Sequence, residues 1–177
     1  MNALVKLDAQ AAALASAAQE PQQYLTFMLG GEVFAIGILH IKEIIEYGQL
    51  TTVPMMPEFI RGVINLRGAV VPVVDLASRF GGKPSPITRR SCIVILELET
   101  DEDTPVIGVV VDAVNEVLEI AGTDIVPPPS FGTRIRTDFI KGMGKVQERF
   151  VIILSVDKVL STDELEWVSR VDLADVI

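Results

Sequence analysis

Short apolar runs separated by turn residues repeat along most of the chain. The first two, at residues 24–29 and 32–36, are joined by Gly30-Gly31, which predicts a β-hairpin. A second predicted hairpin turns at Arg67-Gly68 and connects two Val- and Ile-rich runs. Further strands are predicted at 92–98, 106–111 and 150–156. The pattern therefore predicts a mainly β protein.

Two helical segments interrupt the predicted strands. Asp75 is placed to cap a short helix at 76–80. Ser161 and Glu164 match a capping box, so we expect a C-terminal helix over 161–177 that packs back on the strands. Residues 38–46 fit both a helical turn and a strand, and their periodicity does not decide between the two.

The two halves of the sequence match each other in order. The matched segments are 35–38 with 106–109, 43–46 with 116–119, 53–54 with 126–127, 59–62 with 139–142, and 70–74 with 150–154. Such a series, with small insertions in loops, predicts a duplicated unit of about 70 residues. The alternative is that two β-rich halves share a composition without a common origin.

We therefore expect two small five-stranded β-barrels of the SH3-like kind. The Gly- and Pro-rich segment at 82–86 marks the expected boundary, with one barrel at 21–84 and the other at 85–160. Residues 1–20 are rich in alanine and contain few large apolar side chains, so we expect a flexible N-terminal tail.

Charge and composition exclude several classes of function. The formal net charge is −9, and the basic residues form no cluster, which argues against nucleic acid as a partner. Uncharged stretches reach only about 11 residues, too few for a membrane-spanning helix, so no direct membrane insertion is expected. The single cysteine favours the cytoplasm.

The sequence offers little for catalysis or cofactor binding. His40 is the only histidine and Cys92 the only cysteine, and we interpret both as structural residues, with Cys92 as a buried, unreactive thiol. We find no glycine-rich phosphate loop and no spacing typical of a metal site. We therefore expect no enzyme activity and no cofactor, which leaves binding or scaffolding by elimination.

The run at 59–68, Phe-Ile-Arg-Gly-Val-Ile-Asn-Leu-Arg-Gly, together with 71–76, resembles the CheW family of chemotaxis coupling proteins. Residues 36–38, Glu43-Ile44 and 108–112 support the resemblance, which covers about 22–165. It implies two SH3-like barrels with a groove between them. It also implies a cytoplasmic adaptor, recruited to membrane receptor arrays, that joins the helical tips of chemoreceptors to the regulatory domain of the histidine kinase CheA.

The resemblance also implies two sets of binding residues. The receptor-binding groove would contain Ile38, Ile41, Glu43, Ile44, Arg67, Gly108 and Val114. The kinase-binding segment would contain Glu58, Phe59, Arg61 and Gly62. For the apolar residues the alternative is ordinary barrel core, and for Arg67 it is a solvated turn. The alternative function is a small-molecule or lipid-binding β-barrel, which would need a large cavity that narrow barrels rarely hold.

Overall fold

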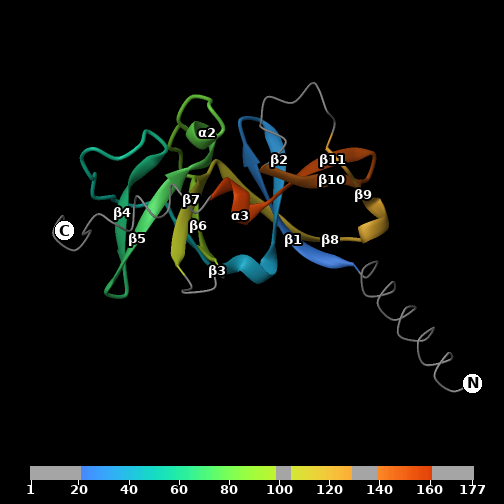
Figure 1. Cartoon of the computed structure of the whole chain (residues 1–177), viewed down its shortest axis with the longest axis horizontal. Coiled ribbons are helices and arrows are strands. Elements are labelled where there is room, and N and C mark those ends of the chain that lie inside the picture. Colours follow the sequence, from blue (N-terminus) through green and yellow to red (C-terminus); the bar gives the residue numbers. More distant parts are fainter. Residues whose placement is uncertain (1–20, 99–104, 129–138, 161–177) are drawn as a thin grey trace, which may run out of the picture.

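The computed structural model describes residues 21–98, 105–128 and 139–160 (Figure 1). The strands are β1 (Gln22–Leu29), β2 (Glu32–Gly37), β3 (Ile41–Glu46), β4 (Ile60–Leu66), β5 (Ala69–Asp75), β6 (Cys92–Glu97), β7 (Val106–Val111), β8 (Ala113–Ile120), β9 (Ile125–Val126), β10 (Ile140–Val146) and β11 (Arg149–Leu154). The short helices are η1 (Ile38–His40), α2 (Leu76–Arg79), η2 (Gly122–Asp124) and α3 (Val156–Val159). The prediction of a mainly β protein is confirmed.

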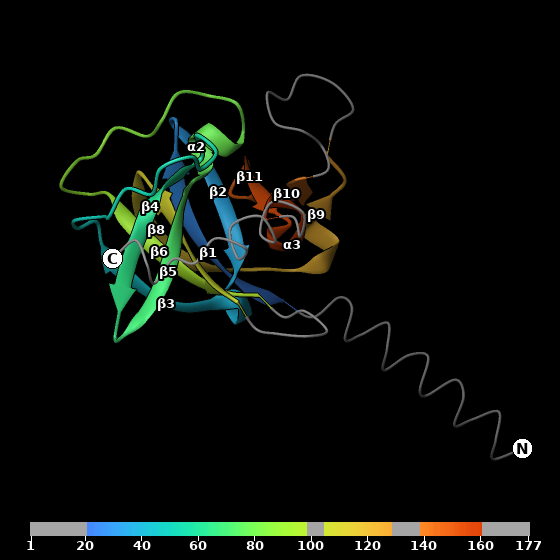
Figure 2. The same cartoon turned by 60° about the vertical axis from the view of Figure 1, so that its left-hand side comes forward.

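Two sheets contain all the described strands. Sheet A has the order β8-β1-β2-β11-β10-β9, and sheet B has the order β3-β6-β7-β5-β4. The turn of the β4–β5 hairpin lies at the lower left in Figure 2. It is the predicted turn at Arg67-Gly68, and Arg67 has a positive φ of 54° there.

The predicted boundary between the barrels is wrong, because each sheet takes strands from both halves of the sequence. Strands β1 and β2 pair with β8 and β11 in sheet A, whereas β3 leaves through η1 and pairs with β6 in sheet B. The sheets are therefore not the contiguous segments 21–84 and 85–160. The sequence of a segment indicates that it forms a strand, but not which strand it pairs with. Because the two halves of the chain are similar, a strand could pair within its own half or with the other half, and the sequence did not show which.

The duplication itself is visible in the strand order. Strands β3, β6, β7, β5 and β4 of sheet B occupy the same places as β8, β1, β2, β11 and β10 of sheet A. The N–H of Asp75 donates to the carbonyl of Phe59 over 2.7 Å, and the N–H of Ser155 donates to that of Phe139 over 2.8 Å. The ladders also shift register at the same place, before Gly62 and before Gly142. We infer that the two sheets are copies of one unit with exchanged strands.

One segment of the predicted repeat is aligned two residues out of register. In the parallel ladders Ile153 pairs with Ala35, and its counterpart Val73 pairs with Gly108. Ala35 therefore corresponds to Gly108, at an offset of 73 rather than 71. A slip of two residues keeps every side chain on the same face of a strand, so the apolar pattern could not reveal the error.

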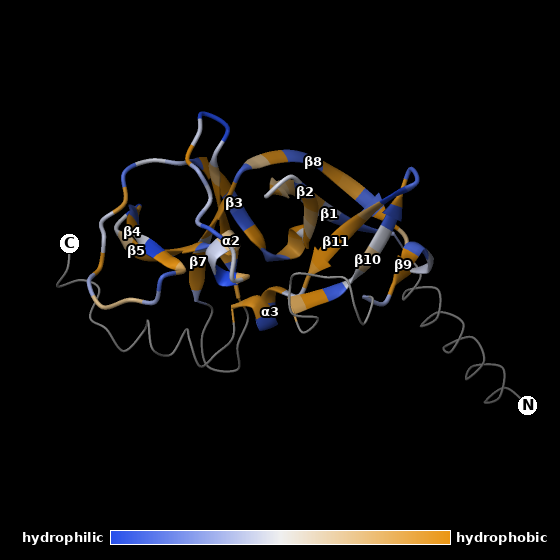
Figure 3. Cartoon of the chain, turned by 90° about the horizontal axis from the view of Figure 1, so that it is seen from above, coloured by the Kyte–Doolittle hydropathy of each residue, from blue (hydrophilic) through white to orange (hydrophobic). Residues whose placement is uncertain are grey.

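The described residues form three apolar clusters. The largest lies between the two sheets and includes Val94 and Leu96, and we call it the interbarrel core. Ile93 and Ile95, the alternate residues of β6, instead belong to a cluster inside sheet B. Strand β6 is therefore buried on both faces, which explains why its sequence is continuously apolar instead of alternating. Figure 3 shows the same apolar colouring along β7.

The predicted cap at Asp75 is confirmed, because its Oδ1 accepts a hydrogen bond from the N–H of Ser78 at the start of α2. Residues 38–46, which the sequence left open, form η1 followed by β3. The predicted tail at 1–20 and helix at 161–177 lie outside the described residues. Within the described residues, no helix is long and apolar enough to span a membrane.

Candidate functional site

The first part of the site lies on β3, an edge strand of sheet B. Ile41 and Ile44 stand opposite Leu96 and Val94 of β6, and both of these partners belong to the interbarrel core. Side chains opposite each other in a ladder point to the same face. Ile41 is half-buried against the interbarrel core, whereas 41% of Ile44 is exposed. This edge of sheet B therefore presents an apolar surface beside the junction of the two barrels.

The second part lies on β8, the equivalent edge strand of sheet A. Val114 and Val117 stand opposite Phe27 and Leu25 of β1, which again belong to the interbarrel core. Val117 is 51% exposed. It corresponds to Ile44 in the repeat, and the sequence match of 43–46 with 116–119 contained the signal, although Val117 was not among the predicted site residues. We call Ile41, Ile44, Val114 and Val117 the paired strips.

Glu43 stands opposite Ile95, on the other face of β3 from the strip, and forms an ion pair with Arg67. Arg67 Nη2 lies 2.8 Å from Glu43 Oε2, and their side chains are 73% and 21% exposed. The pair joins β3 to the β4–β5 turn, that is, the two opposite edges of sheet B. Oε1 of Glu43 is buried and has no hydrogen-bond partner among the described residues. The structure thus brings these two predicted residues together, with the guanidinium of Arg67 as the exposed partner.

Of the remaining predicted groove residues, Ile38 and Gly108 differ in position. Ile38 lies in η1, half-buried against the interbarrel core. Gly108 is buried inside sheet B, where an added Cβ would lie 2.7 Å from Cγ2 of Ile93. The prediction that Gly108 lines a surface groove is therefore wrong. The family motif is present, but a side chain at this position of β7 would point into the barrel.

The four predicted kinase-binding residues lie together where β4 begins. Glu58 is exposed, and Phe59 is half-buried with the Arg79 guanidinium 5.2 Å from its ring centre. Gly62 has no room for a side chain, because an added Cβ would lie 2.5 Å from the carbonyl oxygen of Thr51. Thr51 pairs with Val63, so this close approach fixes the preceding loop against the strand.

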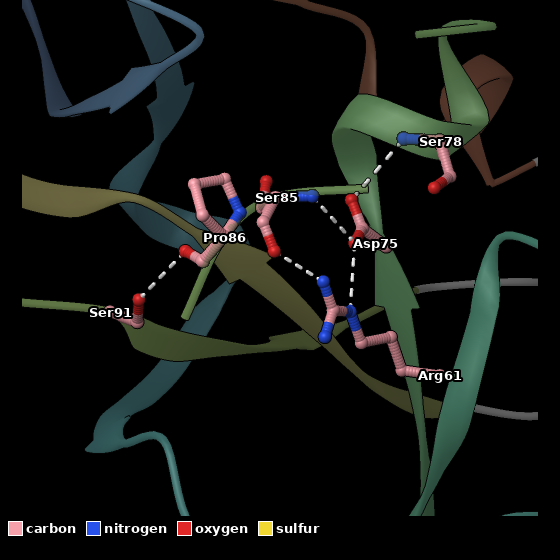
Figure 4. Close-up of polar contacts among 6 residues, drawn as sticks. All are labelled: Arg61, Asp75, Ser78, Ser85, Pro86 and Ser91. Atoms are coloured by element: carbon pink, nitrogen blue, oxygen red, sulfur yellow. Dashed lines mark hydrogen bonds and ion pairs between the residues drawn. The ribbon is translucent and has the colours of Figure 1, made fainter. Parts of the chain in front are cut away.

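Arg61 is held inside a polar network (Figure 4). Its Nε lies 2.8 Å from Asp75 Oδ2, and its Nη2 donates to the carbonyl of Ser85. The Ser85 N–H donates to the same Asp75 oxygen over 3.0 Å. Burial alone would lower the pKa of Arg61, but the hydrogen bond and charge of Asp75, with a contribution from Tyr47, raise it above its ordinary value. Arg61 therefore fastens the segment around Ser85 to sheet B.

His40 and Cys92 are both half-buried, so Cys92 is less buried than expected. The Cys92 thiol donates to the carbonyl of Arg90 over 3.4 Å. No group of three or more potential metal ligands occurs within the described residues.

Known proteins resemble this chain over most of its length. The model of the CheW-like domain matches residues 23–164. The chemotaxis protein CheW of Klebsiella aerogenes is 35% identical over 150 residues, which cover 85% of this chain and 88% of that protein. The probable chemotaxis protein CheW of Rhizobium etli is 31% identical over 154 residues, covering 87% and 97%.

A solved structure shares the fold as well as the sequence. The crystal structure of the scaffolding protein TtCheW from Thermoanaerobacter tengcongensis superposes with a TM-score of 0.72 at 34% identity. The match covers 81% of this chain and 90% of that one. Since the family model spans both barrels and the relatives agree over the same region, the chain belongs to the CheW-like domain family.

Proposed function

We propose that the protein is a non-catalytic adaptor of bacterial chemotaxis that couples transmembrane chemoreceptors to the histidine kinase CheA. The observation that supports this most is the pair of apolar strips, one on each barrel, within a chain that belongs to the CheW-like family. In the cell, such an adaptor is cytoplasmic and is recruited to receptor arrays at the membrane.

The paired strips suit the helical tip of a receptor. Ile44 and Val117 expose apolar side chains, and Ile41 and Val114 connect them to the interbarrel core. An amphipathic helix that lies along such a surface buries apolar residues spaced three and four apart. The exposed guanidinium of Arg67 would add a polar contact, which helps to fix the direction of the helix.

The start of β4 is the proposed contact for the regulatory domain of CheA. Glu58 provides an exposed charge, and Phe59 a half-buried ring. Arg61 and Gly62 act differently, because the first is bound to Asp75 and the second is packed on Thr51. They hold the segment in shape instead of offering free side chains to the kinase.

The mechanism requires positioning and no chemical step. The exchanged strands connect the two barrels, so partners bound at the strips and at β4 are held at a fixed separation. Holding two partners together raises the effective concentration of each near the other, and modest contacts then suffice for a firm assembly.

A small-molecule or lipid carrier is not favoured. Large side chains fill both barrels, with Tyr24, Ile120 and Ile153 inside sheet A and Ile93 and Ile95 inside sheet B. Carrying a lipid would need a cavity where these side chains lie.

Co-purification with a receptor cytoplasmic tip and the CheA regulatory domain tests the proposal. We expect a ternary complex from purified components. Ile41→Ala should weaken receptor binding by about 1–3 kcal/mol if Ile41 is an anchor of the interface. Failure of the wild-type protein to bind either partner would contradict the proposed function.

A further inference from the structure

The short helices α2 and α3 hold the same place in the two copies of the repeat. Helix α2 follows β5 and α3 follows β11, and both span four residues. The N–H groups of the residues that follow them, Phe80 and Leu160, each donate to the first carbonyl of their own helix over 3.0 Å. The last residues of the two helices, Arg79 and Val159, are therefore equivalent positions of the repeat.

These two equivalent residues contact each other. Arg79 Nε donates a hydrogen bond to the carbonyl oxygen of Val159 over 2.9 Å. Phe59 and Phe139 are also equivalent, and the central carbon of the Arg79 guanidinium lies 5.2 Å and 4.6 Å from the centres of their rings. Where an approximate twofold axis relates two copies, a contact between equivalent residues lies next to that axis. Arg79 thus lies where the two copies meet.

Only one of the two copies has a charged side chain at this position, because its counterpart is a valine. The last carbonyls of a helix have no partner within the helix, so the carbonyl of Val159 needs an outside donor. A guanidinium is flat, so it stacks on aromatic rings while the N–H groups at its edge donate hydrogen bonds. Arg79 uses both properties at once.

The contacts of Arg79 connect the proposed kinase-binding segment to the other copy of the repeat. Phe59 is the half-buried ring of that segment and directly precedes β4 of sheet B. Phe139 and Val159 are buried and lie next to β10 and β11 of sheet A. The following residue, Phe80, strengthens the junction, with its ring centre 5.9 Å from that of Phe139. The ring of Phe59 is therefore supported by a side chain that is anchored on sheet A.

We propose that Arg79 is a positioning residue for the kinase contact and holds Phe59 in a fixed place relative to both barrels. The inference rests on the proposed function, because it takes the segment around Phe59 as the surface that meets the CheA regulatory domain. The attraction between the cation and the two ring faces keeps the Phe59 side chain at the junction. A ring that is already ordered loses less conformational entropy when a partner binds, so the affinity is higher.

A double-mutant cycle on kinase binding tests the proposal. Arg79→Leu keeps apolar bulk and removes the guanidinium, and we expect it to weaken binding of the CheA regulatory domain at least fivefold, with receptor-tip affinity within twofold of wild type. Phe59→Leu should weaken kinase binding at least as much, and adding Arg79→Leu to it should change the affinity by less than twofold. Arg79→Lys, which keeps a cation, should recover part of the affinity. Arg89→Leu is the control, since Arg89 is exposed on the loop before β6.

Amide hydrogen exchange measured by NMR tests the positioning without any partner, so its outcome is independent of the proposed function. The N–H of Asp75 donates to the carbonyl of Phe59 and reports how firmly that residue is held. In Arg79→Leu we expect this N–H to exchange at least three times faster than in wild type. The N–H groups of β6, which is buried on both faces, should exchange as before.

Wild-type kinase affinity in Arg79→Leu would overturn the inference, and so would unchanged exchange at Asp75. Additive losses in the double variant would show that Arg79 acts on the kinase by itself and not through Phe59. Equal losses of kinase and receptor binding would make Arg79 a general structural residue. If the wild-type protein bound no kinase domain, the proposed function would fail, and exchange at Asp75 would decide alone whether Arg79 holds Phe59.

Discussion

At the residue scale, two arginines six positions apart on one hairpin act in different ways. Arg61 bonds a buried carboxylate, whereas Arg67 extends from the turn and pairs with Glu43 while remaining 73% exposed. The sequence motif contains both residues and places both near binding surfaces. Only the three-dimensional structure distinguishes them, because burial of Asp75 depends on packing from β7 and from the segment around Ser85.

Arg67→Glu should leave folding nearly unchanged and disrupt receptor–kinase complexes. An exposed ion pair contributes at most about 1 kcal/mol, so the melting temperature should shift only slightly. The new carboxylate would repel Glu43 and remove the donor offered to a partner. Thermal melting and co-purification measure the two effects. A protein that unfolds on this change would show Arg67 to be a structural residue, in conflict with its proposed role.

Asp75→Ala should destabilise the fold strongly. It removes the cap of α2 and leaves Arg61 partly buried without its anion, a loss that typically amounts to about 3–5 kcal/mol for buried pairs. Ser155→Ala is the control, because Ser155 holds the equivalent position at α3 but makes no side-chain cap bond. Urea denaturation of both variants measures the difference. Similar losses in the two would contradict the assigned network.

At the element scale, the sequence predicted strands and turns better than their partners. Both glycine hairpins and the cap at Asp75 depend on residues close in sequence, and they were predicted from local patterns. The exchange of β3 and β8 was not predicted. Each of them pairs with a strand far away in the sequence, and such pairing is decided by packing between whole sheets. The role of Val117 followed from that pairing and was missed with it.

Deletion of residues 1–20 should lower the free energy of unfolding by less than about 2 kcal/mol, the scale of burying one large apolar side chain. These residues contain few large apolar side chains, so their removal should cost little. Urea denaturation of the full and shortened chains tests this prediction. A larger loss would show that residues 1–20 form part of the main core.

At the scale of the whole molecule, the exchanged strands make two barrels into one structural unit. Sheet A needs β1 and β2 from one copy of the repeat and β8 to β11 from the other, and the interbarrel core joins both sheets. The fixed geometry that an adaptor requires thus results from the topology. The paired strips are a second consequence, since exchange places β3 and β8 at equivalent edges.

The isolated segment 21–84 should therefore fail to fold. It would contain β1 and β2 without β8 and β11, and β3 without β6. The intact chain should unfold in one cooperative transition, which circular dichroism and intrinsic fluorescence would report at the same denaturant concentration. A folded fragment, or two separated transitions in the intact chain, would contradict the exchanged topology.

The central claim is that the paired strips on β3 and β8 bind the receptor, and charge substitution on each strip tests it most directly. Affinity for a receptor cytoplasmic tip would be measured for Ile44→Asp, Val117→Asp and the control Phe150→Asp, whose side chain is exposed on β11. We expect Ile44→Asp and Val117→Asp each to weaken binding at least tenfold, about 1.4 kcal/mol, with unchanged melting curves. Phe150→Asp should bind as the wild type does. Wild-type affinity in both strip variants would show that the receptor binds elsewhere on the molecule.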